Sequence, residues 1–241
     1  MGNKFKKQNQ NIAVFTDFDG TITKLDIGDE IFKVFGEFEP HHSLLMEGTL
    51  GISEYWNIVC NSLRVGKKEI EEFALKAETD MYFAKFAEYC KSNEIDIKVI
   101  SDGFDAYIYP VLIQLGLDWV KVRCNSMKFL NGKIEPVFPL ASESCECLCA
   151  SCKRNAMLNE VPEKTIIVFI GDGVSDYCAA EHADIIFAKG KLAAYCNANK
   201  LPHYPYNTFF DVIRIFEKIF PDKLKQRNQA DLLRRKAFET E

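Results

Sequence analysis

Two aspartates near the N-terminus are well suited to chemistry at phosphorus. Asp17 and Asp19 stand two residues apart in the segment DFDGT. One carboxylate of such a pair can attack phosphorus and form a covalent phospho-enzyme, while the other protonates the leaving alcohol and later activates water. The pattern DxDG also begins a calcium-binding loop, but the twelfth position, which needs a carboxylate, holds Gly28. The pair therefore favours phosphoryl transfer over calcium, with a purely structural turn as the other alternative.

A second group of carboxylates, in the segment GDGVSD, suits a magnesium ion. Asp172 and Asp176 are four residues apart in this segment. Magnesium prefers oxygen ligands and usually takes one or two carboxylates, with water and phosphate oxygens completing its octahedron. The alternative is that both aspartates only cap the helix that follows. If the fold brings this segment to Asp17, the three carboxylates predict a magnesium site.

Ser101-Asp102-Gly103 and Lys153 are candidates for holding the phosphate itself. A hydroxyl and exposed backbone N–H groups at the start of a helix form a natural phosphate cradle. A serine or aspartate before a helix is, however, commonly only a cap. An ammonium fixed near the transferring phosphoryl group would offset its negative charge. Each of these signals is weak alone, so their weight depends on where the chain places them relative to the aspartates.

Short apolar runs rich in β-branched residues precede the motifs and indicate buried parallel strands. The clearest runs are Ile12–Thr16, Ile95–Ile100 and Thr165–Ile170, and two weaker ones are Trp119–Arg123 and Asp184–Phe187. Helical patterns follow at Ala106–Leu115 and Ser175–His182. Strands that alternate with helices predict an α/β fold with a doubly wound parallel sheet, in which ligands bind beyond the carboxyl ends of the strands. The polar turns after the clearest strands all fall at that edge.

The stretch from residue 25 to 79 shows helical periodicity only and predicts a small helical cap inserted after the first strand. Residues 1–24 and 80–241 then form the catalytic α/β core. Asn131-Gly132, between two strand-like runs, predicts a tight hairpin. Phe209–Phe220 has an amphipathic helical pattern that ends before Pro221. The charged residues 222–241 predict a loose helix or a disordered tail.

The order of the motifs, DxDGT, then serine, then lysine, then GDxxxD, resembles that of the haloacid dehalogenase superfamily. The resemblance extends from about Asn11 to Phe220 and implies a Rossmann-like α/β core. Dehalogenase members lack the second aspartate, which is present here as Asp19, and the ion pumps carry DKTGT instead. A cap between the first and second motifs is similar to the phosphoserine phosphatase branch.

The resemblance implies a role for each matched residue. Asp17 is implied to be the nucleophile, and Asp19 the general acid and base. The implied activity is magnesium-dependent hydrolysis of a small phosphate monoester through an aspartyl-phosphate. Ser101 and Lys153 are implied to hold the phosphoryl oxygens. The residues expected to bind the substrate are Ser101, Asp102, Gly103, Lys153 and Asp26.

Four aspartates are implied to hold or support the magnesium ion. Asp17 and Asp172 are implied to bind it through their carboxylates, and Asp19 through its backbone carbonyl. Asp176 is implied to support it directly or indirectly. These assignments follow from the resemblance, and they agree with the oxygen ligands that magnesium prefers.

Within this branch, four local features resemble the phosphatases of methionine salvage that act on 2-hydroxy-3-keto-5-methylthiopentenyl-1-phosphate. They are DFDGTIT with Asp26 beyond it, VISDGFDAYI, a cysteine-rich segment leading into Lys153, and HYPYNTFFDVI. Phosphoserine is the alternative substrate, but its phosphatases usually carry glutamate where Asp26 stands and a cap arginine for the substrate carboxylate. Arg64, the one arginine between residues 25 and 79, has surroundings unlike that site. A phosphotransferase or mutase and a non-catalytic binding protein are the alternatives from other classes.

Four cysteines within eight residues form a separate candidate site. They are Cys145, Cys147, Cys149 and Cys152. Four thiolates suit a structural zinc ion in tetrahedral geometry, although the C-x-C-x-C spacing is tighter than that of usual zinc knuckles. Unliganded thiols and a redox-active pair are the alternatives. Because the cluster adjoins Lys153, the order of this loop is expected to affect catalysis in each case.

Composition limits the partners of the chain. Its 241 residues carry a net charge of −5, which gives no general attraction to nucleic acid or to anionic membranes. No apolar run is long enough for a membrane span, and the polar start of the chain lacks the apolar stretch of a secretory signal. Nine cysteines without such a signal favour a reducing, cytoplasmic setting. The expected partner is a small phosphorylated metabolite, and the sequence gives no oligomeric state.

Overall fold

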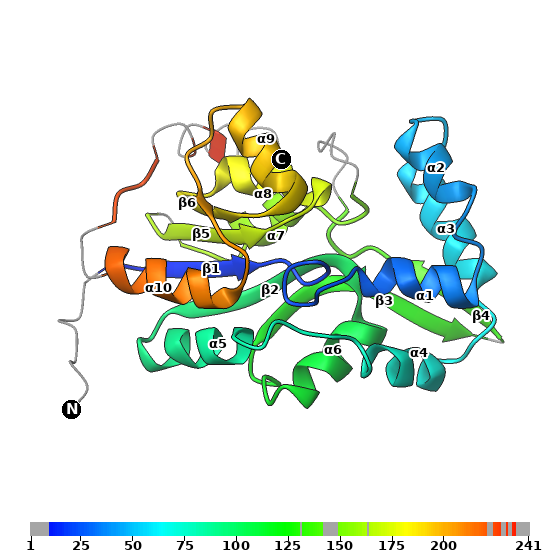
Figure 1. Cartoon of the computed structure of the whole chain (residues 1–241). Coiled ribbons are helices and arrows are strands. Elements are labelled where there is room, and N and C mark those ends of the chain that lie inside the picture. Colours follow the sequence, from blue (N-terminus) through cyan, green and yellow to red (C-terminus); the bar gives the residue numbers. More distant parts are fainter. Residues whose placement is uncertain are drawn as a thin grey trace.

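A central sheet organises the computed structural model, which describes residues 10–130, 132–141, 149–162, 164–220, 224–227, 230 and 233–234. In this part of the chain seven strands lie in the order β4-β3-β2-β1-β5-β6-β7 (Figure 1). Neighbouring strands are parallel except β3 and β4, which form an antiparallel hairpin. The strands are β1 Ile12–Thr16, β2 Asp96–Phe104, β3 Lys121–Leu130, β4 Lys133–Val137, β5 Ile166–Gly171, β6 Ile185–Ala188 and β7 Tyr204–Pro205.

Helices cover both faces of the sheet, as the doubly wound prediction requires. One face carries α5 Phe83–Ser92, α6 Asp105–Gln114 and α10 Phe209–Ile219, and the other carries α7 Lys153–Leu158, α8 Tyr177–His182 and α9 Gly190–Ala198 (Figure 1). Successive residues of a strand point to opposite faces. Val14 therefore packs in the first hydrophobic cluster, and Phe15 packs in the second. The predicted fold class is confirmed.

Four helices lie between β1 and α5 in the sequence and stand together at one end of the sheet (Figure 1). They are α1 Ile27–Phe35, α2 His41–Met46, α3 Ile52–Ser62 and α4 Lys67–Ala74. The chain enters and leaves this block side by side, because Thr23 and Thr79 form an antiparallel bridge. The block also packs on the rest of the molecule, since α3 contacts β4 and α4 contacts α6. These helices occupy the segment predicted to be a cap.

Several elements differ from the sequence prediction. β2 continues through Ser101-Asp102-Gly103, where a turn was expected, although its pairing with β3 is interrupted after Ile100 and resumes only at Phe104. β7 was not predicted, since two residues are too few to show a periodic pattern. The tail is also partly docked: Leu224 and Ala230 are buried, and Arg234 pairs with Asp184 at 3.0 Å. None of the helices in the described ranges is long and apolar enough to cross a membrane.

Candidate active site

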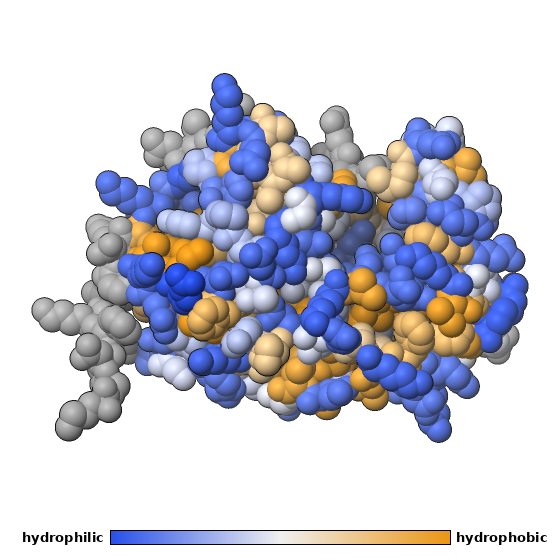
Figure 2. Space-filling view, in the orientation of Figure 1, coloured by the Kyte–Doolittle hydropathy of each residue, from blue (hydrophilic) through white to orange (hydrophobic). Residues whose placement is uncertain are grey.

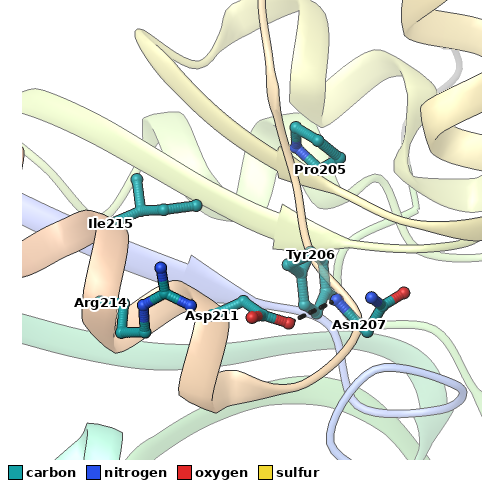
Figure 3. Close-up of a pocket in the computed structure, with 6 residues that line it drawn as sticks. All are labelled: Pro205, Tyr206, Asn207, Asp211, Arg214 and Ile215. Carbon is teal, nitrogen blue, oxygen red and sulfur yellow. Dashed lines mark hydrogen bonds between the residues drawn. The ribbon is translucent and has the colours of Figure 1, made fainter.

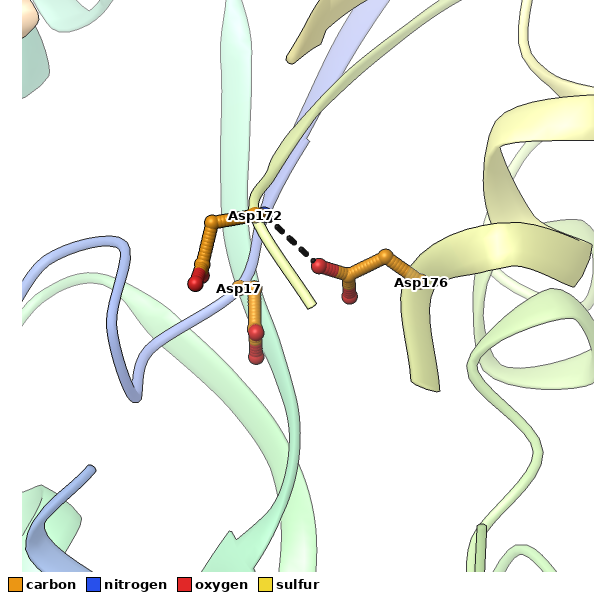
Figure 4. Close-up of side chains that lie close together, drawn as sticks. All are labelled: Asp17, Asp172 and Asp176. Atoms are coloured by element: carbon orange, nitrogen blue, oxygen red, sulfur yellow. Dashed lines mark hydrogen bonds between the residues drawn. The ribbon is translucent and has the colours of Figure 1, made fainter. Parts of the chain in front are cut away.

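The ends of β1 and β5 bring the predicted aspartates together. The two strands pair in parallel with Thr16 beside Ile170, and the N–H of Asp17 donates to the carbonyl of Ile170 at 2.9 Å. Asp172 follows at the end of β5. Each of Asp17, Asp172 and Asp176 offers one carboxylate oxygen, and these oxygens lie within 4.8 Å of one another. Figure 4 shows Asp17 after β1 and both Asp172 and Asp176 on the turn after β5, with the three side chains close together.

Lys153 lies in the middle of this group. Its Nζ is 2.7 Å from Oδ1 of Asp17 and 2.7 Å from Oδ1 of Asp176. All three residues are buried. Burial alone would lower the pKa of Lys153, but the two carboxylates raise it above its ordinary value. The lysine therefore stays charged and fixes a positive centre beside Asp17.

Asp176 acts on its neighbours through both carboxylate oxygens. Oδ1 accepts from Lys153, and Oδ2 accepts from the backbone N–H groups of Asp172 and Gly173 at 2.9 and 3.0 Å. The carboxylate also approaches Gly171 closely, because a Cβ there would lie 2.4 Å from Oδ2. Asp176 therefore fixes the turn that carries Asp172.

Asp172 faces the loop that follows β1. Its Oδ1 accepts from the hydroxyl of Thr21 at 2.7 Å. Gly20 has φ +71° and lies so near that a Cβ would be 2.6 Å from Oδ2 of Asp172. Burial raises the pKa of Asp172, and the negative charge of Asp176 adds to the rise. Sequence reasoning did not select Thr21, although it belongs to the DFDGT segment.

The carboxylates fit a magnesium ion. Burial, followed by the charge of Asp176, raises the pKa of Asp17 well above its ordinary value. Asp17 and Asp172 lie side by side in Figure 4, and each has a carboxylate oxygen free of the contacts given above to Lys153 or Thr21. A hard divalent cation would relieve their repulsion with the oxygen ligands it prefers. Among the described residues, these aspartates form the one group of histidine, cysteine and acidic side chains that could hold a metal.

The structure gives no support to the zinc hypothesis. Cys145 and Cys147 lie outside the described residues, so only half of the cluster can be placed. Cys149 is partly exposed and Cys152 is buried, directly before Lys153. The described residues contain no group of sulfur ligands that could hold a metal.

Asp19 lies outside the group formed by Asp17, Asp172 and Asp176. Its Oδ1 accepts from the N–H of Ile27 at 2.9 Å, and its Oδ2 accepts from the hydroxyl of Tyr107 at 2.8 Å. Burial raises the pKa of Asp19 well above its ordinary value, and the nearby charge of Asp26 adds to the rise. An upward shift of the pKa is the direction that a general acid needs.

Ser101 and Asp102 take different positions. Ser101 faces the cleft described below, and its Oγ accepts from the N–H of Gly103 at 2.9 Å. The carboxylate of Asp102 instead accepts from the backbone N–H groups of Ala150 and Ser151 at 2.9 to 3.1 Å. Enclosure by the surrounding protein raises the pKa of Asp102 to about 6. This contact ties β2 to the residues just before Lys153.

A cleft of about 510 Å³ joins these residues to the block of helices. In Figure 2 a hollow separates the block from the rest of the surface, with hydrophobic surface beside it. Its polar lining includes Asp17, Asp19, Ser101, Asp102, Gly103, Lys153 and Asp172. Its apolar lining comes from the block and includes Leu45, Met46, Ile52, Tyr55 and Trp56. The cleft therefore has charged residues from the sheet edge on one wall and apolar residues, together with Asp26 and Asp29, on the wall formed by the block.

Asp26 also lines the cleft, where α1 begins. Its Oδ1 accepts from the N–H of Asp29 at 2.8 Å, so that it caps α1. Burial, followed by the charge of Asp29, raises the pKa of Asp26 to about 6. Asp29 lines the cleft as well. Two carboxylates thus face the space next to the apolar wall.

A second, smaller hollow of about 250 Å³ has none of Asp17, Asp172 and Asp176 in its lining (Figure 3). It is lined by Pro205, Tyr206, Asn207, Asp211, Arg214 and Ile215. The carboxylate of Asp211 is engaged by the N–H groups of Asn207 and Thr208 at 3.0 and 3.2 Å. It serves as a cap at the start of α10 rather than as a free acid. The first cleft is therefore the candidate active site.

Sequence reasoning missed several residues that hold the site together. The hydroxyl of Tyr107 contacts Asp19 across 88 residues of sequence. The amide of Asn125 donates to the carbonyl of Asp102 at 2.6 Å. Tyr206 donates to the carbonyl of Gly171 at 3.3 Å, behind the strand that carries Asp172. No local pattern signals such contacts, because each joins segments far apart in the chain.

Solved structures with the same architecture are phosphatases. The structure titled as the phospho-aspartyl intermediate analogue of phosphoserine phosphatase superposes with a TM-score of 0.67 at 19% identity, covering 88% of this chain and all of the other. A substrate-bound phosphoserine phosphatase gives a TM-score of 0.67 at 16% identity, covering 86% and 99%. At such low identity the likeness establishes the fold.

Sequence comparison then defines the family. Residues 14–181 match the haloacid dehalogenase-like hydrolases, and the chain belongs to that family. A relative from Brevibacillus brevis is 30% identical over 221 residues, covering 88% of this chain and 97% of the relative. One from Bacillus pumilus is 32% identical over 214 residues, covering 86% and 91%. Both are named 2-hydroxy-3-keto-5-methylthiopentenyl-1-phosphate phosphatase.

Proposed function

We propose that this hydrolase is a magnesium-dependent phosphatase that uses Asp17 as its nucleophile and acts on 2-hydroxy-3-keto-5-methylthiopentenyl-1-phosphate. The observation that carries the mechanism is the position of Asp17, buried at the end of β1 with Lys153 at 2.7 Å and Asp172 beside it. A buried carboxylate with these neighbours suits attack on phosphorus better than a structural turn does. The calcium and helix-cap alternatives do not account for this convergence.

The first step forms the phospho-enzyme. A carboxylate oxygen of Asp17 bonds to phosphorus, the bond from phosphorus to the leaving oxygen breaks, and Asp19 gives its proton to that oxygen. The raised pKa of Asp19 supports the protonated form that this step needs. Lys153 offsets the negative charge of the phosphoryl oxygens, and the hydroxyl of Ser101 faces them from the end of β2.

The second step returns the enzyme to its starting state. The Asp19 carboxylate takes a proton from water, whose oxygen bonds to phosphorus while the bond between phosphorus and Asp17 breaks. Asp17 and Asp172 would hold magnesium through carboxylate oxygens, with Asp19 contributing its backbone carbonyl and Asp176 supporting from behind. When bound, the ion supplies charge neutralisation for the phosphoryl oxygens. Asp102 and Gly103 contribute to the site mainly by shaping the wall behind Ser101.

The shape and chemistry of the cleft support the substrate assignment. We propose that residues 25–79 form a cap that selects the substrate and that residues 1–24 and 80–241 form the catalytic core. The name of the relatives' substrate describes a phosphate at one end and a methylthio group at the other. The cleft likewise has Lys153 among its charged residues at the sheet edge and apolar residues such as Leu45 and Trp56 on the wall formed by the block. Apolar side chains can bury a thioether without any unmet hydrogen bond.

Phosphoserine is the second candidate substrate. Asp26 and Asp29 in the cleft could accept hydrogen bonds from a substrate ammonium group. The described residues that line the cleft, however, include no arginine for the substrate carboxylate. Arg64 instead donates to the backbone carbonyls of Asn61 and Leu63. The methylthio substrate therefore fits the lining better.

The test is phosphate release with magnesium across a panel that contains both substrates and simple monoesters. We expect the wild type to prefer the methylthio substrate and Asp17→Asn to lose at least about 1,000-fold in rate, because the amide is a poor nucleophile. A preference for phosphoserine would reassign the substrate and leave the mechanism in place. Full activity in the variant would disprove the nucleophile, and products formed by transfer to another alcohol would indicate a phosphotransferase.

A further inference from the structure

Tyr107 is a buried tyrosine whose hydroxyl points at Asp19. It lies in the first turns of α6 and is only 2% exposed. Its hydroxyl donates to Oδ2 of Asp19 at 2.8 Å, while the N–H of Ile27 occupies Oδ1 at 2.9 Å. Both oxygens of the carboxyl group are therefore engaged, one by α6 and one by the start of α1. Two contacts from different elements prevent the group from rotating about its bond to Cβ.

Two glycines leave the space that this hydroxyl needs. A Cβ on Gly103 would lie 2.0 Å from the Tyr107 hydroxyl and 2.7 Å from Oδ2 of Asp19. A Cβ on Gly28 would lie 2.9 Å from the same hydroxyl. These glycines come from β2 and α1, which are far apart in sequence. At both positions a side chain would collide with the hydroxyl, and glycine leaves room for it.

Packing alone does not explain a tyrosine at this position. Its ring lies 6.1 Å from the ring of Phe18 and belongs to the large hydrophobic cluster of the sheet. A phenylalanine would fill the same space without burying a polar atom, which costs free energy unless the atom is hydrogen-bonded. The hydroxyl has Asp19 as its partner and also lines the cleft. The hydroxyl of Tyr107 therefore serves the carboxyl group of Asp19 and not the packing of the core.

We infer that Tyr107 is a positioning residue that aims the carboxyl of Asp19 at the leaving oxygen, an inference that rests on the function proposed above. When Asp19 gives its proton to that oxygen, the hydroxyl of Tyr107 and the N–H of Ile27 remain as donors to the new carboxylate. They stabilise the charge that develops on Asp19 as the proton departs, without moving. The same two contacts then hold the carboxylate in place while it takes a proton from water.

The test compares two classes of substrate in Tyr107→Phe with magnesium present. An alkyl phosphate such as glycerol 2-phosphate needs a proton on its leaving oxygen, whereas p-nitrophenyl phosphate releases p-nitrophenolate, which is stable as an anion. We expect kcat/KM for the alkyl ester to fall about 10- to 100-fold, part of the contribution usual for general acid catalysis. For the aryl ester, we expect kcat/KM to stay within about threefold, because its first step needs no acid.

Two further variants separate positioning from folding. Gly28→Ala keeps the hydroxyl but crowds it, at a helical position where alanine is favourable. This variant should also lose kcat/KM on the alkyl ester more than on the aryl ester, by a smaller factor than Tyr107→Phe. Tyr109→Phe removes a hydroxyl from the same helix at a side chain 45% exposed, and should leave both substrates unaffected. An equal loss on both esters in Tyr107→Phe, or no loss on either, overturns the inference while the phosphatase proposal stands. A wild type that hydrolyses neither ester nor the panel above overturns both.

Discussion

At the scale of single residues, the site depends on a buried positive charge held between negative ones. Lys153 is 3% exposed, and the two carboxylates it contacts are 4% and 0% exposed at Asp17 and Asp176. Taking such charges out of water is costly, and the cost is repaid only while every partner is present. Removing one partner leaves the others uncompensated, whereas removing a matched pair is much less harmful. Stability and activity should therefore respond differently to changes at this lysine.

We expect Lys153→Met to lower the free energy of unfolding by about 3–5 kcal/mol, because it leaves two buried carboxylates facing each other. It should also reduce phosphatase turnover by at least about 100-fold, since the fixed charge beside the phosphoryl group is lost. Combining it with Asp176→Asn should restore much of the stability and none of the turnover. Urea unfolding and phosphate release measure the two effects.

The control for this prediction is Lys98→Met. Lys98 is also buried, at 2% exposure, but it pairs with Asp96 and Glu160 away from the cleft. This variant should lose stability and keep its turnover once folded. If Lys153→Met retained wild-type turnover, the proposal that the Lys153 ammonium offsets the charge of the phosphoryl group would be wrong.

At the scale of elements, Asp102 links three segments that together place Lys153. It lies on β2, contacts Asn125 on β3, and accepts from the N–H groups of Ala150 and Ser151. The next residues begin α7, whose first residue is Lys153. The side chain predicted to bind substrate thus holds a loop in place through backbone hydrogen bonds. Its effect on catalysis should pass through the order of that loop.

We expect Asp102→Ala to speed amide hydrogen exchange at Ala150 and Ser151 and to reduce turnover about 10-fold, because the loop before Lys153 loses its anchor. Asp105→Ala is the matched control, since Asp105 makes a similar bond to the N–H of Met127 elsewhere. Unchanged exchange at both amides in Asp102→Ala would contradict the anchoring role.

The pH dependence of stability gives a second measurement on the same variant. The pKa of Asp102 is about 6 in the folded protein, above the ordinary value of about 3.9 in an unfolded chain. The folded state therefore binds the Asp102 proton more tightly than the unfolded state does. The stability that this proton contributes is fully present below about pH 4 and is lost as the pH rises through 6. The free energy of unfolding should fall less steeply over this window in Asp102→Ala than in the wild type.

The same elements show what the sequence can and cannot predict. β1 was predicted with its observed bounds, because four consecutive apolar residues followed by a β-branched threonine leave little choice. The meeting of Asp17 with Asp172 followed from the rule that parallel strands end at one edge. The contacts of Tyr107 with Asp19 and of Asp102 with Ser151 could not be predicted, since they join segments 88 and 49 residues apart without any periodic signal.

At the scale of the whole molecule, the carboxylates of Asp17, Asp172 and Asp176 come together from distant parts of the chain. Their negative charges repel one another. Asp17 follows β1, near the N-terminus, whereas Asp172 and Asp176 follow β5. Burial and mutual repulsion raise the pKa of Asp17 and of Asp172. A cation bound between β1 and β5 would therefore stabilise the fold as well as the reaction. The stabilisation of the fold by the cation can be measured without any substrate.

We expect magnesium at about 100 times its dissociation constant to raise the free energy of unfolding by about 2.7 kcal/mol, because the ion binds the folded state only. Asp172→Asn should abolish this increment, whereas Asp29→Asn, a neutralised carboxylate of the cleft lining, should retain it. The increment should also shrink as the pH falls, since the raised pKa values of Asp17 and Asp172 mean that protons compete with the ion. Thermal unfolding with and without magnesium measures each case. An equal increment in wild type and Asp172→Asn would place the ion elsewhere and remove Asp172 from the metal site.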